Sequence, residues 1–205
     1  MSEKNQNMER QIIDAAEELF LKRGFTRTST TEIAQKAGCN QALVHYYFRT
    51  KENLFNKLFE EKFLMFIESI SIDEECKGAL KERIENIVTK HIDFLCQNPG
   101  LPLLLLSEVN RNSDHIGHIF EKMKIHAVHI VGMLETEIAK EREKGLVRDV
   151  NGFDLIFNII SLNVFMFIAK PLLLNIREMN DESYIAFINA RKDEIIKIII
   201  GGIYL

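Results

Sequence analysis

Residues 24–54 read GFTRTSTTEIAQKAGCNQALVHYYFRTKENL, and they carry the most specific structural pattern of the chain. Its Ser-x-x-Glu pattern at 29–32 is a capping box, which predicts the start of a short helix over 30–37. A glycine-containing turn over 38–40 leads at once into a second short helix over 41–47. Two short helices joined by a three-residue turn are typical of a helix-turn-helix, so we expect this motif here.

Helical patterns continue on both sides of this motif. Apolar residues recur at three- and four-residue spacing over 9–22, and again from residue 51 to residue 70. Thr50 is the expected N-cap of the second of these helices. We therefore predict a three-helix, helix-turn-helix domain over residues 1–50 and a larger helical domain over residues 51–205.

The same periodicity predicts five further helices after residue 70. They are expected over residues 79–96, 103–110, 114–144, 153–173 and 181–200. The chain holds only three prolines and ten glycines, and no apolar–polar alternation lasts long enough to build a sheet. The predicted fold class is therefore all-α, with about nine helices.

Charge divides unevenly along the chain. The net charge is −4, but residues 1–51 carry eight Lys and Arg against six Asp and Glu, which gives them +2 and leaves −6 for the remainder. A basic head on an acidic body is the asymmetry expected when only the head approaches phosphates. The bias is small, so it supports a nucleic-acid partner without deciding the matter.

The remaining composition points to a protein of the cytoplasm. Cys39, Cys76 and Cys96 are far apart and form no CxxC pair, which suits reduced thiols better than disulfides. The polar N-terminus has no apolar core of the kind that signal peptides carry. The most apolar stretch, over 153–169, is interrupted by Asp, Asn and Ser, so we interpret it as a buried helix and expect no membrane association.

The helix over 41–47 has side chains suited to reading a DNA major groove. Its first turn is small and polar, so it can enter the groove. There Gln41 can pair with an adenine edge, and Ala42 leaves room for a thymine methyl group. Tyr46 and Tyr47 suit phosphate contacts through their hydroxyls, although a place in the core of the head is the alternative for Tyr47.

Residues 24–54 resemble the DNA-binding head of TetR-family repressors. The positions that carry the resemblance are Gly24, Phe25, the Ser/Thr start of the helix over 30–37, Ile33, Ala34, Ala37, Gly38, Leu43, Tyr47, Phe48, Lys51, Glu52 and Leu54. The match covers about the first quarter of the chain, and beyond residue 60 only length and helix order agree. The resemblance implies a sequence-specific transcriptional regulator that binds a palindromic operator in double-stranded DNA.

The resemblance and the side-chain chemistry assign the same DNA contacts. The predicted DNA-binding residues are Thr30, Thr31, Asn40, Gln41, Ala42, His45, Tyr46, Tyr47 and Lys51. The two threonines would offer hydroxyls at a helix N-terminus, and Lys51 would add an ammonium group. At the position of His45 the family usually has tyrosine, which leaves this one contact open.

The helices over 153–173 and 181–200 carry more apolar residues than one small body can bury. We therefore predict a homodimer through these two C-terminal helices, which the resemblance also implies. The alternative is an ordinary core within one chain, because helices that are apolar all round also occur inside large domains.

The resemblance also implies a pocket for a small-molecule effector. The candidate ligand-binding residues are Met65, Phe66, Phe94, Leu105, Glu108, Phe120, Met123 and Phe165. Core packing is the alternative for each apolar member, because pockets and cores use the same residue types.

The chain offers no catalytic or metal-binding motif. It lacks GxSxG, P-loop and HExxH patterns and a Cys/His nucleophile pair, so we expect neither enzyme activity nor a cofactor. His115, His118, His126 and His129 form one narrow stripe on the helix over 114–144, but eight residues of helical rise, roughly 12 Å, separate His118 from His126. We interpret the stripe as exposed or partner-facing rather than metal-binding.

Together these observations predict a repressor that an effector releases from DNA. Ligand binding in the helical domain would move the helix that starts at Lys51 and change the spacing of two paired heads. The alternative is a ligand-independent DNA-binding factor that recruits a protein partner, which a solidly packed body with an exposed apolar patch would indicate.

Overall fold

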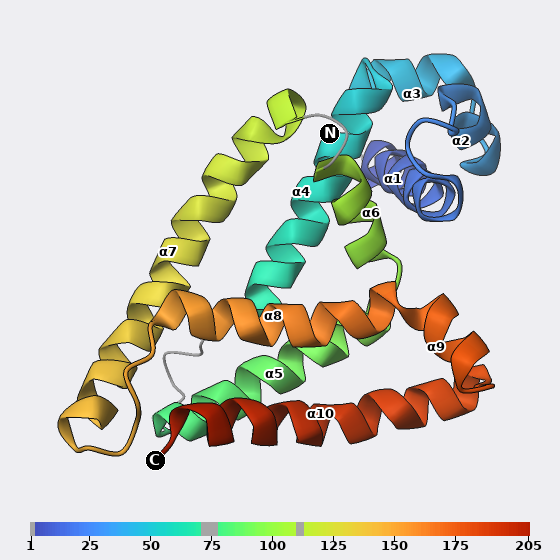
Figure 1. Cartoon of the computed structure of the whole chain (residues 1–205). Coiled ribbons are helices and arrows are strands. Elements are labelled where there is room, and N and C mark those ends of the chain that lie inside the picture. Colours follow the sequence, from blue (N-terminus) through green and yellow to red (C-terminus); the bar gives the residue numbers. More distant parts are fainter. Residues whose placement is uncertain (1–2, 71–77, 110–112) are drawn as a thin grey trace. The chain divides into compact units, whose positions relative to one another are not determined.

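The computed structural model describes residues 3–70, 78–109 and 113–205, and for residues 3–6, 69–70, 107–109, 113–120, 122 and 123 it describes the backbone alone. The regular elements in these ranges are helices, with one isolated β-bridge between Val147 and Tyr204. They are α1 (Glu3–Arg23), α2 (Thr30–Lys36), α3 (Gln41–Phe48), α4 (Lys51–Ile70), α5 (Leu80–Gln97), α6 (Leu101–Val109), α7 (Ser113–Glu143), α8 (Gly152–Ile168), α9 (Lys170–Ile176) and α10 (Asp181–Ile203) (Figure 1). The prediction of an all-α fold is confirmed for the described part of the chain.

The described residues divide into two compact units. The head unit holds those up to Leu64 together with those of Leu103–Phe120, and the body unit holds those of Met65–Pro102 and Glu121–Leu205. α4 contributes its first part to the head unit and its last part to the body unit. The units are defined by compactness, so the functional division after residue 50 stays a prediction.

An aromatic cluster organises the head unit. Phe20 on α1, Phe25 in the following loop and Phe55 on α4 are buried, with ring centroids between 5.2 and 5.6 Å apart. An ion pair also joins α1 to α4, because Lys62 Nζ lies 2.6 Å from Glu17 Oε1. These contacts give α2 and α3 a fixed scaffold, and α2 packs against both α1 and α3.

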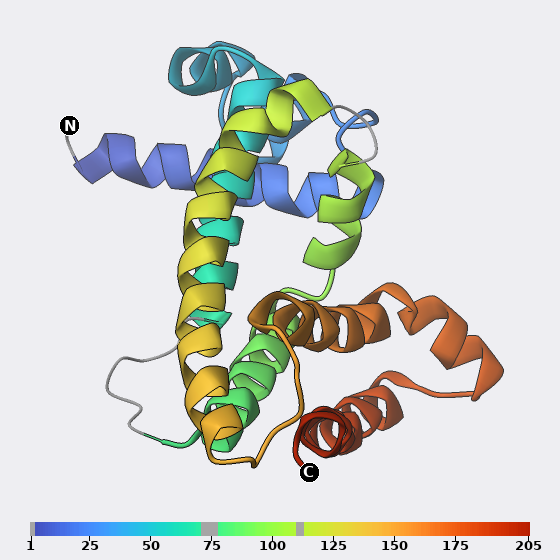
Figure 2. The same cartoon turned by 60° about the vertical axis from the view of Figure 1, so that its left-hand side comes forward.

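Three helices, α5, α8 and α10, form the centre of the body unit. α5 packs against both α8 and α10. α8 and α10 run side by side in opposite directions (Figure 1 and Figure 2). The end of α10 is tied to the loop before α8, where the Arg148 amide donates to the Ile203 carbonyl at 2.8 Å and the Leu205 amide to the Leu146 carbonyl at 3.1 Å. The buried residues of α5 recur at the helical spacing expected from the sequence.

The single helix expected over 153–173 is instead two helices, α8 and α9, bent by 61°. Pro171 is the physical reason, because its ring collides with the carbonyl four residues earlier in a continuous helix and it has no N–H to donate. Proline is tolerated in the first turn of a new helix, which is where α9 places it. No single described helix is long and apolar enough to cross a membrane, and α8 with α9 meets that standard only as a bent pair, by length and composition.

Two uncharged polar side chains, His91 on α5 and Asn163 on α8, are fully buried inside the apolar body unit. The amide Nδ2 of Asn163 lies 3.1 Å from His91 Nδ1. Burial lowers the pKa of His91 from 6.5 to about 4, because desolvation penalises the charged imidazolium. The ring is therefore neutral in the folded protein at neutral pH.

This lowered pKa predicts a specific pH dependence of stability. Between pH 6.5 and about 4 the unfolded chain takes up a proton that the folded chain does not, so stability is lost as the pH falls through this window, by about 3 kcal/mol in full. Urea unfolding of the wild type and His91→Leu from pH 7.5 to pH 4 should show a steeper decline in the wild type. Exposed His126→Leu is the matched control and should keep the wild-type slope, whereas parallel profiles for His91→Leu would contradict the prediction.

Candidate nucleic-acid interface

The start of α2 is fixed by the capping box that the sequence predicts. The Glu32 amide donates to Ser29 Oγ at 3.2 Å, and Glu32 Oε2 accepts from the Ser29 amide at 2.9 Å. These hydrogen bonds lower the pKa of Glu32, with the bond from the Ser29 backbone as the largest cause. Two otherwise unpaired backbone donors are satisfied, so α2 begins at one defined residue.

The turn between α2 and α3 depends on Gly38 and Asn40. Gly38 has φ +70°, in the left-handed region that favours glycine, and the Cys39 amide donates to the Ala34 carbonyl at 2.9 Å. Asn40 then caps α3, because its Oδ1 accepts from the Leu43 amide at 2.9 Å. The predicted helix-turn-helix is therefore present. The side-chain oxygen of Asn40 is occupied in capping α3.

The two faces of α3 differ in burial. Val44 and Phe48 point into the core of the head unit. Gln41, Ala42, His45 and Tyr46 lie on the exposed side, and Tyr46 leaves 68% of its surface open to solvent. Tyr47 is half-buried, with its ring 5.3 Å from that of Tyr46 and 6.2 Å from that of Phe48. An exposed Tyr on a short helix with a buried opposite face is what a reading helix presents.

Hydrogen bonds link the exposed side chains into a chain from α2 to the end of α3. Gln41 Nε2 donates to Thr30 Oγ1 at 3.0 Å and lies 3.4 Å from His45 Nε2. His45 Nδ1 lies 2.9 Å from the Arg49 carbonyl. Because a carbonyl only accepts, His45 carries its proton on Nδ1, and its Nε2 accepts from Gln41. Both amide protons of Gln41 thus have partners within the head, which leaves its Oε1 as the acceptor on the exposed face.

Sequence reasoning missed the part that Arg49 plays in this chain. Arg49 caps α3 with φ +65°, a conformation that non-glycine residues rarely adopt, and this turns its carbonyl toward the His45 ring. No residue pattern signals such a cap, because arginine has no preference for the left-handed region.

Lys51 has a structural role in addition to the predicted one. Its Nζ donates to the Phe25 carbonyl at 3.0 Å and to the Thr28 carbonyl at 2.8 Å, and it lies 4.3 Å from the centroid of the Phe25 ring. The ammonium group thus ties the start of α4 to the loop before α2 and uses two of its three protons. Thr50 caps α4 as predicted, accepting from the Asn53 amide at 3.1 Å.

The predicted effector residues fall in both units. Leu105, Glu108 and Phe120 belong to the head unit, and Met65, Phe66, Phe94, Met123 and Phe165 to the body unit. The side chains of Glu108, Phe120 and Met123 lie outside the described residues. In the body unit, Phe66 and Phe94 pack with ring centroids 6.1 Å apart, whereas Phe165 is 65% exposed. Their assignment to a ligand stays a prediction.

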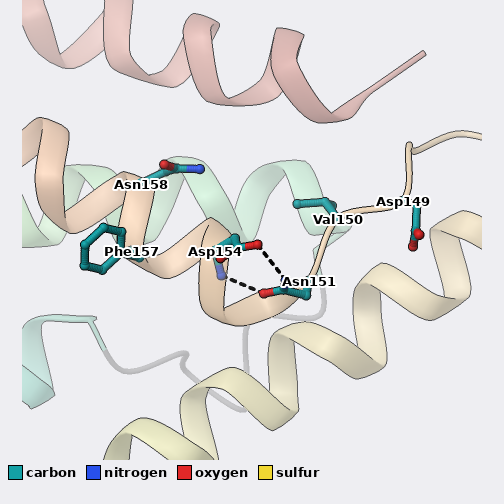
Figure 3. Close-up of a pocket in the computed structure, with 6 residues that line it drawn as sticks. All are labelled: Asp149, Val150, Asn151, Asp154, Phe157 and Asn158. Atoms are coloured by element: carbon teal, nitrogen blue, oxygen red, sulfur yellow. Dashed lines mark hydrogen bonds between the residues drawn. The ribbon is translucent and has the colours of Figure 1, made fainter.

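A hollow of about 420 Å³ opens at the start of α8 (Figure 3). It is lined by Asp149, Val150, Asn151, Asp154, Phe157 and Asn158. Asn151 caps the helix and also donates to the Asp154 carboxylate at 2.6 Å, and Asp149 is paired with Arg142 at 3.1 Å. These polar groups already have partners within the body unit, so the hollow does not match the apolar pocket that the sequence predicts.

The histidine stripe on α7 is only partly described. His126 and His129 are exposed, and the side chains of His115 and His118 lie outside the described residues. Among the described residues there is no group of three or more His, Cys, Asp or Glu side chains that could hold a metal ion.

Comparison with known proteins gives matches over the head and over the whole chain. Residues 12–58 match the family model described as bacterial regulatory proteins, tetR family. The fatty acid metabolism regulator protein of Bacillus subtilis (strain 168) is 25% identical over 195 residues, which cover 95% of this chain and 94% of that protein. The nucleoid occlusion factor SlmA of Shewanella woodyi is 30% identical over 151 residues, which cover 70% of each protein.

A solved structure shares the fold over most of the chain. The transcriptional regulator FadR from Bacillus subtilis, in complex with stearoyl-CoA, superposes with a TM-score of 0.70. The superposition covers 94% of this chain and 98% of that one, at 22% sequence identity. A likeness at this identity shows that the two chains share a fold.

The contacts of Lys51 predict that its loss weakens the fold of the head. Lys51→Met removes two hydrogen bonds from a charged donor and should cost about 2 kcal/mol of unfolding free energy, measured by urea denaturation without DNA. Lys57→Met on the same helix breaks only an exposed ion pair to Glu61 and should cost less than about 0.5 kcal/mol. Equal stability of the two variants would mean that Lys51 does not hold the head together.

Proposed function

The chain belongs to the TetR family of bacterial regulatory proteins, and from this premise we propose that it is a repressor released from a palindromic operator by a small-molecule effector. As a family member it is a DNA-binding transcriptional regulator. It would act in the cytoplasm, where the bacterial chromosome lies. The observation that carries the proposal is α3 itself, whose N-terminus is capped by Asn40 and whose outer face is exposed.

In this proposal α3 enters the major groove with its first turn. Gln41 Oε1 would accept from a base that presents an amino group in the groove, adenine or cytosine, because the amide protons of Gln41 are held within the head. Ala42 would face a thymine methyl group. Thr31, which is exposed beside the N-terminus of α2, and Tyr46 would reach phosphates through their hydroxyls.

The other predicted contacts would act mainly at the phosphate backbone or by positioning. Tyr47 would contact phosphate through its hydroxyl while its ring packs in the head, and Lys51 retains one ammonium proton for the same purpose. Thr30, Asn40 and His45 would hold Gln41 and α3 in place, since their side chains already bond within the head. Specificity would thus rest on the first turn of α3.

A homodimer would supply the second head that a palindrome requires. A single head makes few phosphate contacts, so heads of this kind bind as symmetric pairs. α8 leaves Phe153, Phe157 and Phe165 between 59% and 65% exposed, and on α10 Ile185 is 60% exposed. Large apolar side chains in such numbers on neighbouring helices are expected to be covered by a second copy of the chain.

The effector would be a largely apolar molecule bound in the body unit. Phe66 and Phe94 form an aromatic pair there, and a protein similar to this chain over most of its length is a fatty acid metabolism regulator. A structure that shares the fold was solved with stearoyl-CoA, so a long-chain acyl thioester is the first effector class to test.

A second candidate function is a ligand-independent DNA-binding factor that recruits a protein partner. One SlmA protein, 30% identical over 70% of the chain, favours it, because its name, nucleoid occlusion factor, describes a role at the nucleoid and no small-molecule effector. The two functions share the head and differ in whether a ligand changes DNA affinity.

The DNA-reading role of Gln41 can be measured on a duplex selected from random sequence by the full-length protein. We expect the selected sites to be palindromic, and Gln41→Ala to weaken binding to them by about 10- to 100-fold, because each of the two heads would lose one hydrogen bond of about 0.5–1.5 kcal/mol. Gln11→Ala, an exposed change on α1, is the control and should bind as the wild type does. Unchanged affinity in Gln41→Ala would remove Gln41 from the reading face.

The dimer can be tested by replacing one exposed isoleucine at a time with glutamate. Light scattering should give the wild type twice the 23.8 kDa chain mass, whereas Ile185→Glu should run as a monomer because a buried, unpaired carboxylate opposes association. Ile125→Glu on α7 is the matched control, since Ile125 is 70% exposed, and it should remain dimeric. A dimeric Ile185→Glu would place the interface elsewhere.

Effector release can be tested with stearoyl-CoA on the selected duplex. The repressor proposal predicts that saturating stearoyl-CoA weakens operator binding at least tenfold, because a coupling of about 1–3 kcal/mol is typical of ligand-controlled sites. Coenzyme A without the acyl chain is the control for non-specific anion effects. Direct binding of stearoyl-CoA without any change in operator affinity would favour the ligand-independent factor.

A further inference from the structure

A pair of buried polar side chains lies in the middle of the body unit, outside every residue set that the sequence singled out. His91 and Asn163 are both 0% exposed, and each lies among the otherwise apolar buried residues of its helix, α5 or α8. The two residues are 72 positions apart in the sequence and are brought together by the packing of α5 against α8.

The hydrogen bonds of Asn163 determine where the proton of the His91 ring lies. Asn163 Nδ2 donates to the Val88 carbonyl at 3.4 Å and lies 3.1 Å from His91 Nδ1. An amide nitrogen only donates, so His91 Nδ1 accepts. The proton of the neutral ring is therefore on Nε2.

Two polar atoms of the pair have no hydrogen-bond partner within the part of the chain that the structure describes. They are His91 Nε2, a donor, and Asn163 Oδ1, an acceptor. Nearly all buried polar atoms in native proteins are paired, because leaving one unpaired costs its full desolvation. The pair therefore offers one unpaired donor and one unpaired acceptor, and a bound polar group could bond to both.

The surroundings of the pair indicate what else the bound molecule would contact. The ring of Phe66 meets the His91 ring edge-on, with centroids 5.0 Å apart, and also packs on Phe94. One of the residues expected at an effector site, Phe66, thus adjoins the polar pair and a second, Phe94, packs behind it, so an occupant would meet aromatic carbon beside one donor and one acceptor.

We propose that His91 and Asn163 are the polar anchor of a ligand site in the body unit, and that they hold a neutral group that both accepts and donates a hydrogen bond. A hydroxyl or an amide on an otherwise apolar molecule has this chemistry. A carboxylate does not, because neither side chain carries a charge to balance one buried beside it. The inference rests on the proposed function only in treating that molecule as the effector.

Three ligands of equal chain length separate these chemistries. Calorimetric titration of the full-length protein at pH 8 with decanamide, 1-decanol and decanoate should show binding of the amide and the alcohol, and at least tenfold weaker binding of decanoate. On adding decanamide, the His91 Nε2–H proton should move downfield in the NMR spectrum, because it gains an acceptor. Equal or tighter binding of decanoate, no binding of the amide and the alcohol, or an unmoved His91 signal would overturn the proposal.

Variants of the pair provide the second test. Asn163→Leu should weaken decanamide binding at least tenfold, and the matched control Asn158→Leu, an exposed change on the same helix, should leave it unchanged. If Asn163→Leu does not fold, His91→Phe combined with Asn163→Leu removes both polar partners together, which is close to neutral for stability, and it should also lose the amide. Wild-type affinity for decanamide in either folded variant would overturn the anchor.

The experiments distinguish a failure of the proposed His91–Asn163 ligand site from a failure of the proposed effector release. Decanamide that binds through His91 and Asn163 but leaves operator affinity unchanged supports the anchor and counts against effector release. Stearoyl-CoA that releases the operator from the wild type, in a protein that binds neither decanamide nor 1-decanol, supports effector release and overturns the anchor.

Discussion

The fold of the head depends on holding in place one helix that cannot stand alone. α3 has eight residues, and isolated helices shorter than roughly 12–15 residues are marginal in water. Its start is fixed by Asn40 and the left-handed turn at Gly38, and its buried face by Val44 and Phe48. With both fixed, the side chains that face outward have one orientation, which is the condition for reading a sequence.

The same constraint explains why several residues serve both the fold and the proposed contact with DNA. Asn40 caps α3, Lys51 joins α4 to the loop before α2, and Thr30 holds Gln41. In a domain this small, few positions lie near both the core and the surface that meets DNA. The arrangement couples recognition to stability, so a loss of DNA binding in a variant has to be compared with its unfolding free energy before it is assigned to a contact.

The sequence predicts the head well because its signals are local. The capping box at Ser29 and Glu32, the glycine at 38 and the cap at Thr50 each act within a few residues, and the structure confirms each of them. The break before α9 could also have been anticipated from Pro171. The pairing of His91 with Asn163 could not, because it joins residues 72 positions apart, although a polar residue on the apolar face of each helix was a visible signal. The hydrogen bonds of Gln41 likewise require three-dimensional distances.

The proposed DNA recognition in this protein requires two copies of the head on one palindrome. Hydroxyl-radical footprinting of the full-length protein on a selected palindromic duplex measures whether both copies bind. We expect two symmetric protected segments whose centres lie about one helical turn, or a small multiple of it, apart. A single protected segment at saturating protein, with no symmetric partner, would contradict this requirement.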